Sequence, residues 1–227
     1  MAIVLAYENS TNPYTETTEV SHIKSDLNEI GNHWAQLVLT GIRKGEKPEI
    51  LIDRSGSMSN PVIKGISRMD VARALMASLA RELREIAPGF DLNQIPVKSW
   101  GSAVYDKHEA VNLNTSPPTF APKMTTLADF EQNELGTGFL PNIPCTDGTN
   151  HSLWLNESNF PLVITDDLYD VEPEFVENYR NFGTGGNQVA PNIVAIGQRH
   201  EANKMHRLNR KIMNMADGYG AINMRDF

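Results

Sequence analysis

Three short runs of apolar residues constrain the fold of this 227-residue chain most strongly. They lie in the segments 49–53 (EILID), 160–165 (FPLVIT) and 192–197 (NIVAIG). Each run is apolar at consecutive positions and too short for a buried helix, which is typical of strands covered on both faces of a parallel sheet. Such strands need helices packed on the sheet, so the runs predict an α/β fold.

Apolar residues at helical spacing separate these runs. A long helix is expected from about Ser21 to Arg43, with Thr18 or Ser21 as its N-cap. A second helix is expected from Met69 to Ile86, ended by Pro88-Gly89. Further expected elements are a strand at 2–7, a strand or tight strand pair at 94–104, a short helix after Gly148, and helices at 172–182 and 200–216.

Alternation of strands and helices indicates a doubly wound domain, with a mostly parallel central sheet flanked by helices. We expect residues 1–227 to form a single domain. Residues 1–46 are expected to be an N-terminal extension with a strand and the long helix. Residues 107–147 are rich in Pro, Thr and Asn and too long for a plain loop, so they are expected to hold short helices or to be an irregular insertion.

Charge and cysteine content narrow the class of protein. Lys and Arg number 20 against 28 Asp and Glu, for a net charge of −8, and no basic tract is present, so we expect no nucleic-acid partner. The single Cys145 allows no internal disulfide and fits a reducing compartment. The first residues do not resemble a secretory signal, and no apolar run approaches the roughly 20 residues of a membrane span. A cytoplasmic protein without a membrane partner is therefore expected.

Oxygen-bearing side chains directly follow two of the apolar runs, and a third group of them precedes the short helix expected after Gly148. They occur in the segments 53–57 (DRSGS), 147–150 (DGTN) and 165–167 (TDD). Ligands of open α/β sheets bind beyond the carboxyl ends of the strands, where these segments can converge. Hydroxyls and carboxylates without His or Cys are the donors of a hard cation, Mg²⁺ by preference, with Mn²⁺ or Ca²⁺ as alternatives. Gly56 would let the backbone curl so that Ser55 and Ser57 both turn inward.

The three segments together resemble the metal-ion-dependent adhesion site (MIDAS) of von Willebrand factor A (vWA) domains. The features are Asp53-x-Ser55-x-Ser57, a later Gly-Thr that leads into a helix, and a later strand that ends in Thr-Asp. The continuation Gly-Ser-Met resembles the sequence of this motif in intracellular bacterial, archaeal and phage members of the family, and in the similar domain of Ro-type RNA-binding proteins. The resemblance extends from about Glu49 to Gly197 and implies the Rossmann-like vWA fold.

Site residues follow from this resemblance. It implies that Ser55 and Ser57 are direct hydroxyl ligands, that Thr149 is the ligand of the second loop, and that Asp53 and Asp166 hold metal-bound waters. In vWA domains the metal keeps an open position for an Asp or Glu of a partner protein. Neutral hydroxyl ligands leave a cation under-neutralised, which favours binding of one more carboxylate.

Two assignments are left open: which threonine is the second-loop ligand, and what Asp167 does in the segment 165–167. Thr137, in the sequence LGTGFLPNIP, is an alternative to Thr149, but Pro141 and Pro144 would interrupt a helix after it. Asp167 stands where the family usually has Gly or Asn. Its carboxylate would either join the outer shell of the cation or cap the next segment.

The expected function is a non-catalytic protein–protein interaction module, with a MoxR-type AAA+ ATPase as a partner that many microbial vWA proteins serve as adaptors. A Mg²⁺-dependent phosphatase of the haloacid-dehalogenase type is an alternative, because Asp53 ends a strand and a second acidic strand end follows. That chemistry needs an acid–base Asp two positions after the nucleophile, where this chain has Ser55. A structural component of an assembly is the other alternative.

Other reactive or polar residues have simpler interpretations. Four histidines lack a partner at metal-ligand spacing and are interpreted as surface residues: His108, His151, His200 and His206. Cys145 is expected to be an inert thiol. The glycine-rich segment 183–186 lacks the Lys of a phosphate-binding loop and is expected to be a turn.

Overall fold

A computed structural model describes residues 2–7, 13–63, 65–105, 107–112, 119–132, 135, 143–148, 160–166 and 192–198. Several expected elements lie outside these residues: the helix after Gly148, the helices at 172–182 and 200–216, and the turn at 183–186. Their predictions stay open.

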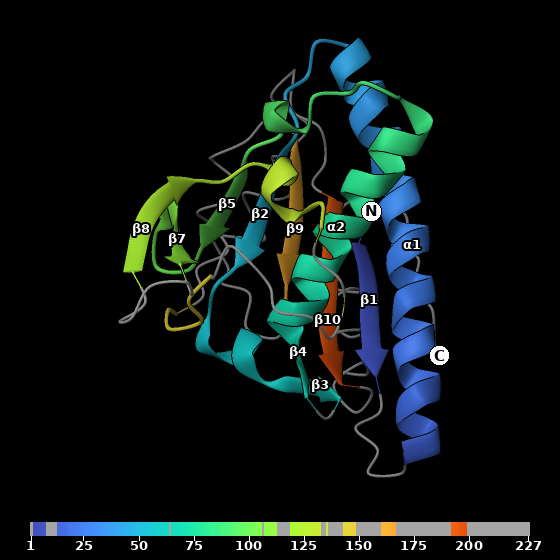
Figure 1. Cartoon of the computed structure of the whole chain (residues 1–227), viewed down its shortest axis with the longest axis vertical. Helices are drawn as coiled ribbons and strands as arrows, with labels where there is room; N and C mark the ends of the chain where they lie inside the picture. The colour runs from blue at the N-terminus through green and yellow to red at the C-terminus, as the bar shows by residue number, and fades with distance from the viewer. Residues whose placement is uncertain are drawn as a thin grey trace, which may run out of the picture.

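A six-stranded sheet forms the centre of the molecule, with the strand order β1-β10-β9-β2-β5-β6 (Figure 1). Its strands are β1 (Ala2–Tyr7), β2 (Glu49–Asp53), β5 (Val97–Trp100), β6 (Val104–Tyr105), β9 (Pro161–Thr165) and β10 (Asn192–Gln198). Every neighbouring pair is parallel except β5–β6, which is antiparallel. The chain therefore has an α/β fold with a mostly parallel sheet, and the strands expected at 2–7, 49–53, 161–165 and 192–197 are confirmed.

Both faces of the sheet exclude water. Ile50 and Ile52 of β2 are fully buried in the core that contains the apolar side chains of both long helices. Leu51 and Val163 point to the opposite face and are also 0% exposed. Burial on both faces explains why the strands are apolar at consecutive positions and do not alternate.

Two long helices, α1 (Pro13–Arg43) and α2 (Arg68–Ile86), pack against each other. In Figure 1, α2 lies in front of the sheet and α1 runs beside β1. Gly31 lies at their contact, where a Cβ atom would come within 2.6 Å of the Ser78 hydroxyl. The absence of a side chain at Gly31 lets the two helices approach closely. The helix expected at Met69–Ile86 is confirmed, and Ser67 caps it in a capping box with Asp70.

The start predicted for α1 is wrong. The helix begins at Pro13, so Thr18 and Ser21 lie within it and do not cap it. Proline is well tolerated in the first turn of a helix, because its missing N–H has no intrahelical partner there. Thr and Glu dominate the sequence of these first turns, and they carry no apolar periodicity that would have indicated a helix.

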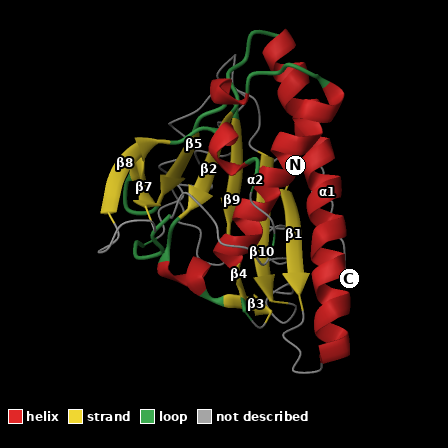
Figure 2. Ribbon diagram, viewed as in Figure 1, coloured by secondary structure: helices red, strands yellow, loops and turns green. Residues whose placement is uncertain are grey.

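Residues 107–124 differ from the irregular structure expected for them. β7 (Lys107–Asn112) and β8 (Thr119–Met124) form an antiparallel pair, which stands at the side of β5 in Figure 2. The expected strand pair at 94–104 is confirmed as β5 and β6. Smaller elements are β3 (Pro61–Ile63), β4 (Ile66–Ser67) and the 3₁₀ helices η1 (Gly56–Ser59), η2 (Leu92–Gln94) and η3 (Leu127–Phe130).

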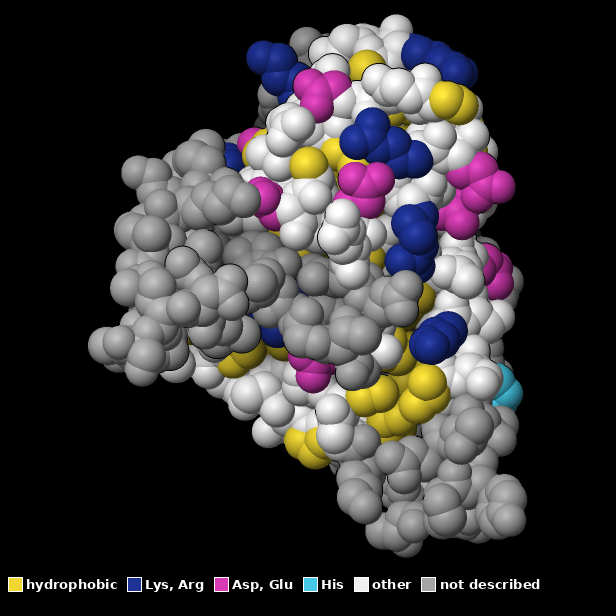
Figure 3. Space-filling model, viewed as in Figure 1, with side chains coloured by type: hydrophobic (Ala, Val, Ile, Leu, Met, Phe, Trp, Pro, Cys, Tyr) yellow, Lys and Arg dark blue, Asp and Glu magenta, His cyan; other side chains and the backbone are white. Residues whose placement is uncertain are grey.

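The segment expected as an N-terminal extension supplies an edge strand of the central sheet. β1 pairs with β10 along its whole length, from Ala2 opposite Ile193 to Tyr7 opposite Gln198. Over α1 and α2, Figure 3 shows Lys and Arg side chains interspersed with Asp and Glu. The described part of this face therefore presents both signs of charge, without a large patch of one sign.

Candidate metal centre

The candidate site lies where β2 and β9 end side by side. From β2 the chain continues to β5 on one side, whereas β9 and β10 lie on the other side of β2. The winding of the sheet therefore reverses between β2 and β9. Open α/β sheets bind ligands beyond the carboxyl ends of their strands at such a switch point.

Asp53 is the last residue of β2 and is 0% exposed. Its Oδ1 accepts a 2.7 Å hydrogen bond from the backbone N–H of Ser55, and its Oδ2 accepts a 2.7 Å hydrogen bond from the Thr165 hydroxyl. The first bond fixes the turn that follows β2, and the second joins this turn to the end of β9. Asp53 therefore holds the two strand ends in register at the site.

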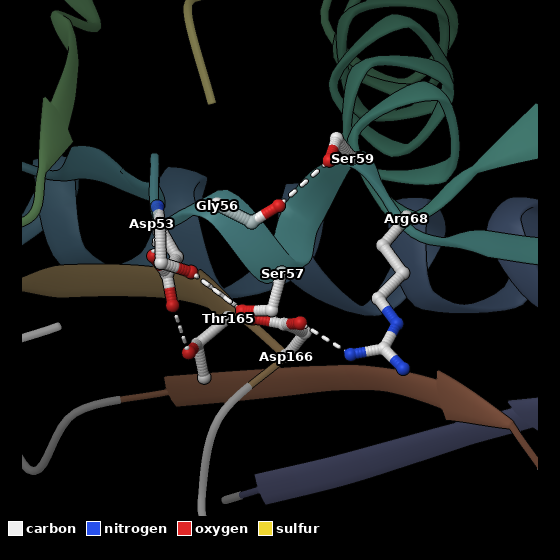
Figure 4. A network of polar contacts seen from close by, with 8 residues as sticks. Asp53, Gly56, Ser57, Ser59, Arg68, Thr165 and Asp166 are labelled. Carbon is white, nitrogen blue, oxygen red and sulfur yellow. Dashed lines mark hydrogen bonds and ion pairs between the residues drawn. The ribbon is translucent and has the colours of Figure 1, made fainter. Parts of the chain in front are cut away.

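Ser55, Ser57 and Asp166 bring three oxygen atoms together. Figure 4 shows Ser57 and Asp166 of this group. The two hydroxyl oxygens lie 2.9 Å apart, and Oδ1 of Asp166 lies 3.0 Å from Ser57 Oγ and 3.3 Å from Ser55 Oγ. Adjacent ligands of an octahedral Mg²⁺ ion, each about 2.1 Å from the metal, are about 3 Å apart. The spacing of the three oxygens thus fits one face of such a coordination shell.

The role expected for Gly56 is wrong. Among the described residues the glycines with positive φ are Gly45, Gly65 and Gly89, so Gly56 does not use a conformation reserved for glycine. A Cβ atom at Gly56 would meet nothing within 4 Å. The turn is tight because Gly56–Ser59 forms a 3₁₀ helix, and this helix carries Ser57 round to face Asp166.

Two carboxylates are buried side by side at this point, since Asp53 is 0% and Asp166 1% exposed. Burial, followed by the negative charge of Asp166, raises the pKa of Asp53 from 3.8 to about 7, while hydrogen bonds from Thr165 and Ser55 partly oppose the rise. A bound cation would remove the repulsion between the two carboxylates.

Arg68 contributes a positive charge on the other side of Asp166. Its Nη1 donates a hydrogen bond to Asp166 Oδ2, and the two side chains form an ion pair that is 5% and 0% exposed, respectively. Asp166 thus presents Oδ1 to the serine hydroxyls and Oδ2 to the guanidinium (Figure 4).

The segment that leads to Thr149 lies against the first loop. The backbone N–H of Gly56 donates to the Asp147 carbonyl at 3.1 Å, and the N–H of Asp147 donates to the Arg54 carbonyl at 3.3 Å. Thr149 itself lies outside the described residues, as do its alternative Thr137 and the neighbouring Asp167. The described chain therefore brings the second loop to the site as far as Gly148.

Asp147 anchors this second loop. Its carboxylate accepts hydrogen bonds from the Ser102 hydroxyl at 2.5 Å, the Tyr105 hydroxyl at 2.9 Å and the Gly148 N–H at 2.9 Å. The hydrogen bond from Ser102 is the main reason that the pKa of Asp147 falls from 3.8 to about 2, with smaller contributions from Tyr105 and Gly148. Gly101 makes room for this carboxylate, because a Cβ atom there would lie 2.6 Å from Asp147 Cβ.

Four of the five site residues expected from the sequence meet in one place: Asp53, Ser55, Ser57 and Asp166. Sequence reasoning missed the hydrogen bond of Thr165, the ion pair of Arg68 and the anchoring role of Asp147. One signal for Arg68 was available. A basic residue directly after a serine cap lies at the positive end of a helix, where a positive charge is unfavourable without a nearby anion.

Conventional metal-binding clusters are absent from the described residues, where no three His, Cys, Asp or Glu side chains are placed to hold an ion. The candidate site has two carboxylates and relies on hydroxyls for its other ligands. Cys145 is half-buried, and burial raises the pKa of its thiol. The structure does not describe the side chains of His108, His151, His200 and His206, so their interpretation as surface residues stays a prediction.

Comparison of the chain with protein-family models, with curated proteins and with solved structures gives no match. The resemblance to vWA domains therefore stays a prediction from the sequence motifs. None of the helices within the described ranges has the length and apolar character needed to cross a membrane.

Proposed function

We propose that this chain is a vWA-like protein–protein interaction module that binds a carboxylate of a partner through a divalent cation, Mg²⁺ by preference. The observation that carries the proposal is the convergence of the Ser55 and Ser57 hydroxyls on Asp166 beyond two adjacent parallel strands. These three residues, with Asp53 and with Thr149 from the second loop, would hold the ion.

A cation in this position supplies a Lewis-acidic site for an external oxygen ligand. The hydroxyl ligands are neutral, and the two carboxylates are already engaged by Thr165 and Arg68. An Asp or Glu of a partner protein would therefore complete both the coordination shell and the charge balance. On the resemblance to microbial vWA proteins, we include a MoxR-type AAA+ ATPase as the proposed class of partner.

The surroundings of Asp53 favour recognition over phosphatase chemistry. A nucleophilic carboxylate has to reach the substrate, whereas Asp53 is 0% exposed and both of its oxygens accept hydrogen bonds. The acid–base Asp that the haloacid-dehalogenase mechanism needs is replaced by Ser55, whose hydroxyl has no comparable acidity. We therefore propose no catalytic residue.

Calorimetric titration of the full chain with Mn²⁺ and Mg²⁺ tests the cation site. The wild type is expected to bind one ion, and Ser57→Ala is expected to bind it roughly tenfold more weakly or worse. Ser59→Ala is a matched control, because Ser59 lies in the same 3₁₀ helix but donates its hydroxyl to the Gly56 carbonyl at 2.7 Å (Figure 4). Equal Mn²⁺ affinity in Ser57→Ala and wild type would overturn the proposed site.

A crystal soaked in Mn²⁺ tests the recognition step. The proposal expects an ion beside Ser55 and Ser57, with a carboxylate or other anion from outside the chain in its coordination shell. An ion at this position whose ligands all come from the chain and from water would count against carboxylate recognition, although the metal site would stand.

A further inference from the structure

Arg68 and Asp166 form the most deeply buried ion pair among the described residues, and it lies at the edge of the candidate metal centre. The side chains are 5% and 0% exposed, and they come from the start of α2 and the end of β9. Burial of a guanidinium is costly unless an anion pairs with it. The first turn of a helix adds to this cost, because the helix dipole is positive there.

Asp70, the described acidic residue in the first turn of α2, is already engaged by other groups. Its Oδ2 accepts hydrogen bonds from the backbone N–H and the hydroxyl of Ser67, and its Oδ1 lies 3.6 Å from Nη1 of Arg73. Asp166 therefore supplies a buried carboxylate that stabilises Arg68 inside the protein. In return, Arg68 neutralises one of the two buried carboxylates of the site.

We infer that Arg68 is a resident counter-ion of the site: it keeps the metal-free domain folded and lowers the affinity of the Ser55–Ser57–Asp166 oxygens for a divalent cation. This inference rests on the proposed function, whose site it regulates. The geometry supports it, because the guanidinium binds Oδ2 of Asp166 while Oδ1 faces the serine hydroxyls. The guanidinium of Arg68 and the divalent cation would therefore act on the carboxylate of Asp166 from opposite sides.

Charge also explains how Arg68 would favour an anionic partner. A divalent ion beside Asp53 and Asp166 would be balanced by these two carboxylates alone. Counted over Asp53, Asp166 and Arg68, the described charged groups of the site, the loaded site would carry one excess positive charge, which an external carboxylate would neutralise. Arg68 thus makes the loaded site attractive to an acidic partner, at the expense of cation affinity.

Calorimetry and thermal unfolding of the full chain test the inference with Mn²⁺ as the probe. In Arg68→Gln the loss of the positive charge is expected to tighten Mn²⁺ binding by roughly tenfold or more. The variant should also have a lower Tm than wild type in EDTA and a larger rise in Tm on addition of Mn²⁺. Arg68→Lys retains the charge and is expected to stay within about threefold of wild-type Mn²⁺ affinity.

The double variant Arg68→Gln/Asp53→Asn keeps the test informative if Arg68→Gln alone fails to fold. It removes one positive and one negative charge, so its Tm in EDTA is expected to exceed that of Arg68→Gln. No gain in Tm would overturn the counter-ion role, as would Mn²⁺ affinity in Arg68→Gln equal to or weaker than that of wild type. If wild type and Arg68→Gln both fail to bind Mn²⁺, the proposed cation site is overturned together with the role of Arg68. If Mn²⁺ binding is lost in Ser57→Ala but unchanged in Arg68→Gln, only the role of Arg68 is overturned.

Discussion

Thr165 and Asp53 lie 112 positions apart in the sequence, and a 2.7 Å hydrogen bond from the Thr165 hydroxyl to Asp53 Oδ2 joins the ends of β9 and β2. Both residues are 0% exposed, so no water replaces either partner. This bond is the direct side-chain connection between the strand that carries the serine loop and the strand that carries Asp166. Its energetic importance can be measured.

Thr165→Val is expected to lower the free energy of unfolding by about 1–3 kcal/mol, because it leaves Asp53 Oδ2 buried without this donor. The two side chains have nearly the same shape, so packing changes little. Urea unfolding in EDTA measures the effect, and Thr40→Val on the exposed surface of α1 is the control, expected within about 0.5 kcal/mol of wild type. A Thr165→Val variant as stable as the control contradicts the structural role of the bond.

The raised pKa of Asp53 predicts that the stability of the metal-free protein depends on pH. Its pKa is about 7 in the folded chain against 3.8 for an ordinary Asp. The folded state therefore binds more protons than the unfolded state between these values, and stability falls as the pH rises from about 4 to about 7. The contribution has a maximum slope of about 1.4 kcal/mol per pH unit.

Urea unfolding of wild type and Asp53→Asn in EDTA, from pH 5 to pH 8, checks this prediction. Other groups titrate over the same range, so the difference between the two proteins is the quantity to follow. Asp53→Asn is expected to lose less stability than wild type up to about pH 7, and the difference is expected to become constant above it. Parallel curves throughout would show that Asp53 ionises normally.

Ser67 caps α2 directly before Arg68, and its hydroxyl accepts a 3.1 Å hydrogen bond from the backbone N–H of Asp70. Ser67→Ala is expected to lower the free energy of unfolding by about 1 kcal/mol, the usual effect of losing such a cap. Urea unfolding checks the value, with the exposed Ser59→Ala as a control of the same chemical change. A loss no greater than that of the control would argue against the cap.

Patterns within short segments made much of the fold predictable. β2, β9 and β10 are apolar at consecutive positions, and α2 carries apolar residues every three or four positions, so each is visible without its neighbours. The start of α1 and the β7–β8 pair lack such patterns in their Thr-, Pro- and Asn-rich sequences. Their structure was therefore missed, although both are regular.

Contacts between distant residues limited what the sequence revealed of the site. Asp53, Ser55, Ser57 and Asp166 follow strand ends, and strand ends of a parallel sheet share one edge, so their meeting was predictable. Arg68 reaches Asp166 across 98 positions, and no local pattern indicates that partner.

Gly101 and Gly56 both lie next to Asp147, but substitutions at the two glycines are expected to have opposite results. At Gly101 a Cβ atom would lie 2.6 Å from Asp147 Cβ, whereas at Gly56 it would meet nothing within 4 Å. Gly101→Ala is therefore expected to displace the second loop and to destabilise the protein by about 1–3 kcal/mol. Gly56→Ala is expected to stay within about 0.5 kcal/mol of wild type, because Gly56 does not have positive φ.

Urea unfolding of both variants, with Mn²⁺ titration of each, separates stability from site formation. Because Asp147 and Gly148 lead directly to Thr149, displacement of this loop in Gly101→Ala is also expected to weaken Mn²⁺ binding, and Gly56→Ala is expected to leave it unchanged. Weaker Mn²⁺ binding in Gly101→Ala at full folding would support a ligand from the second loop. Wild-type Mn²⁺ affinity in a destabilised Gly101→Ala would instead limit the cation site to the loops after β2 and β9.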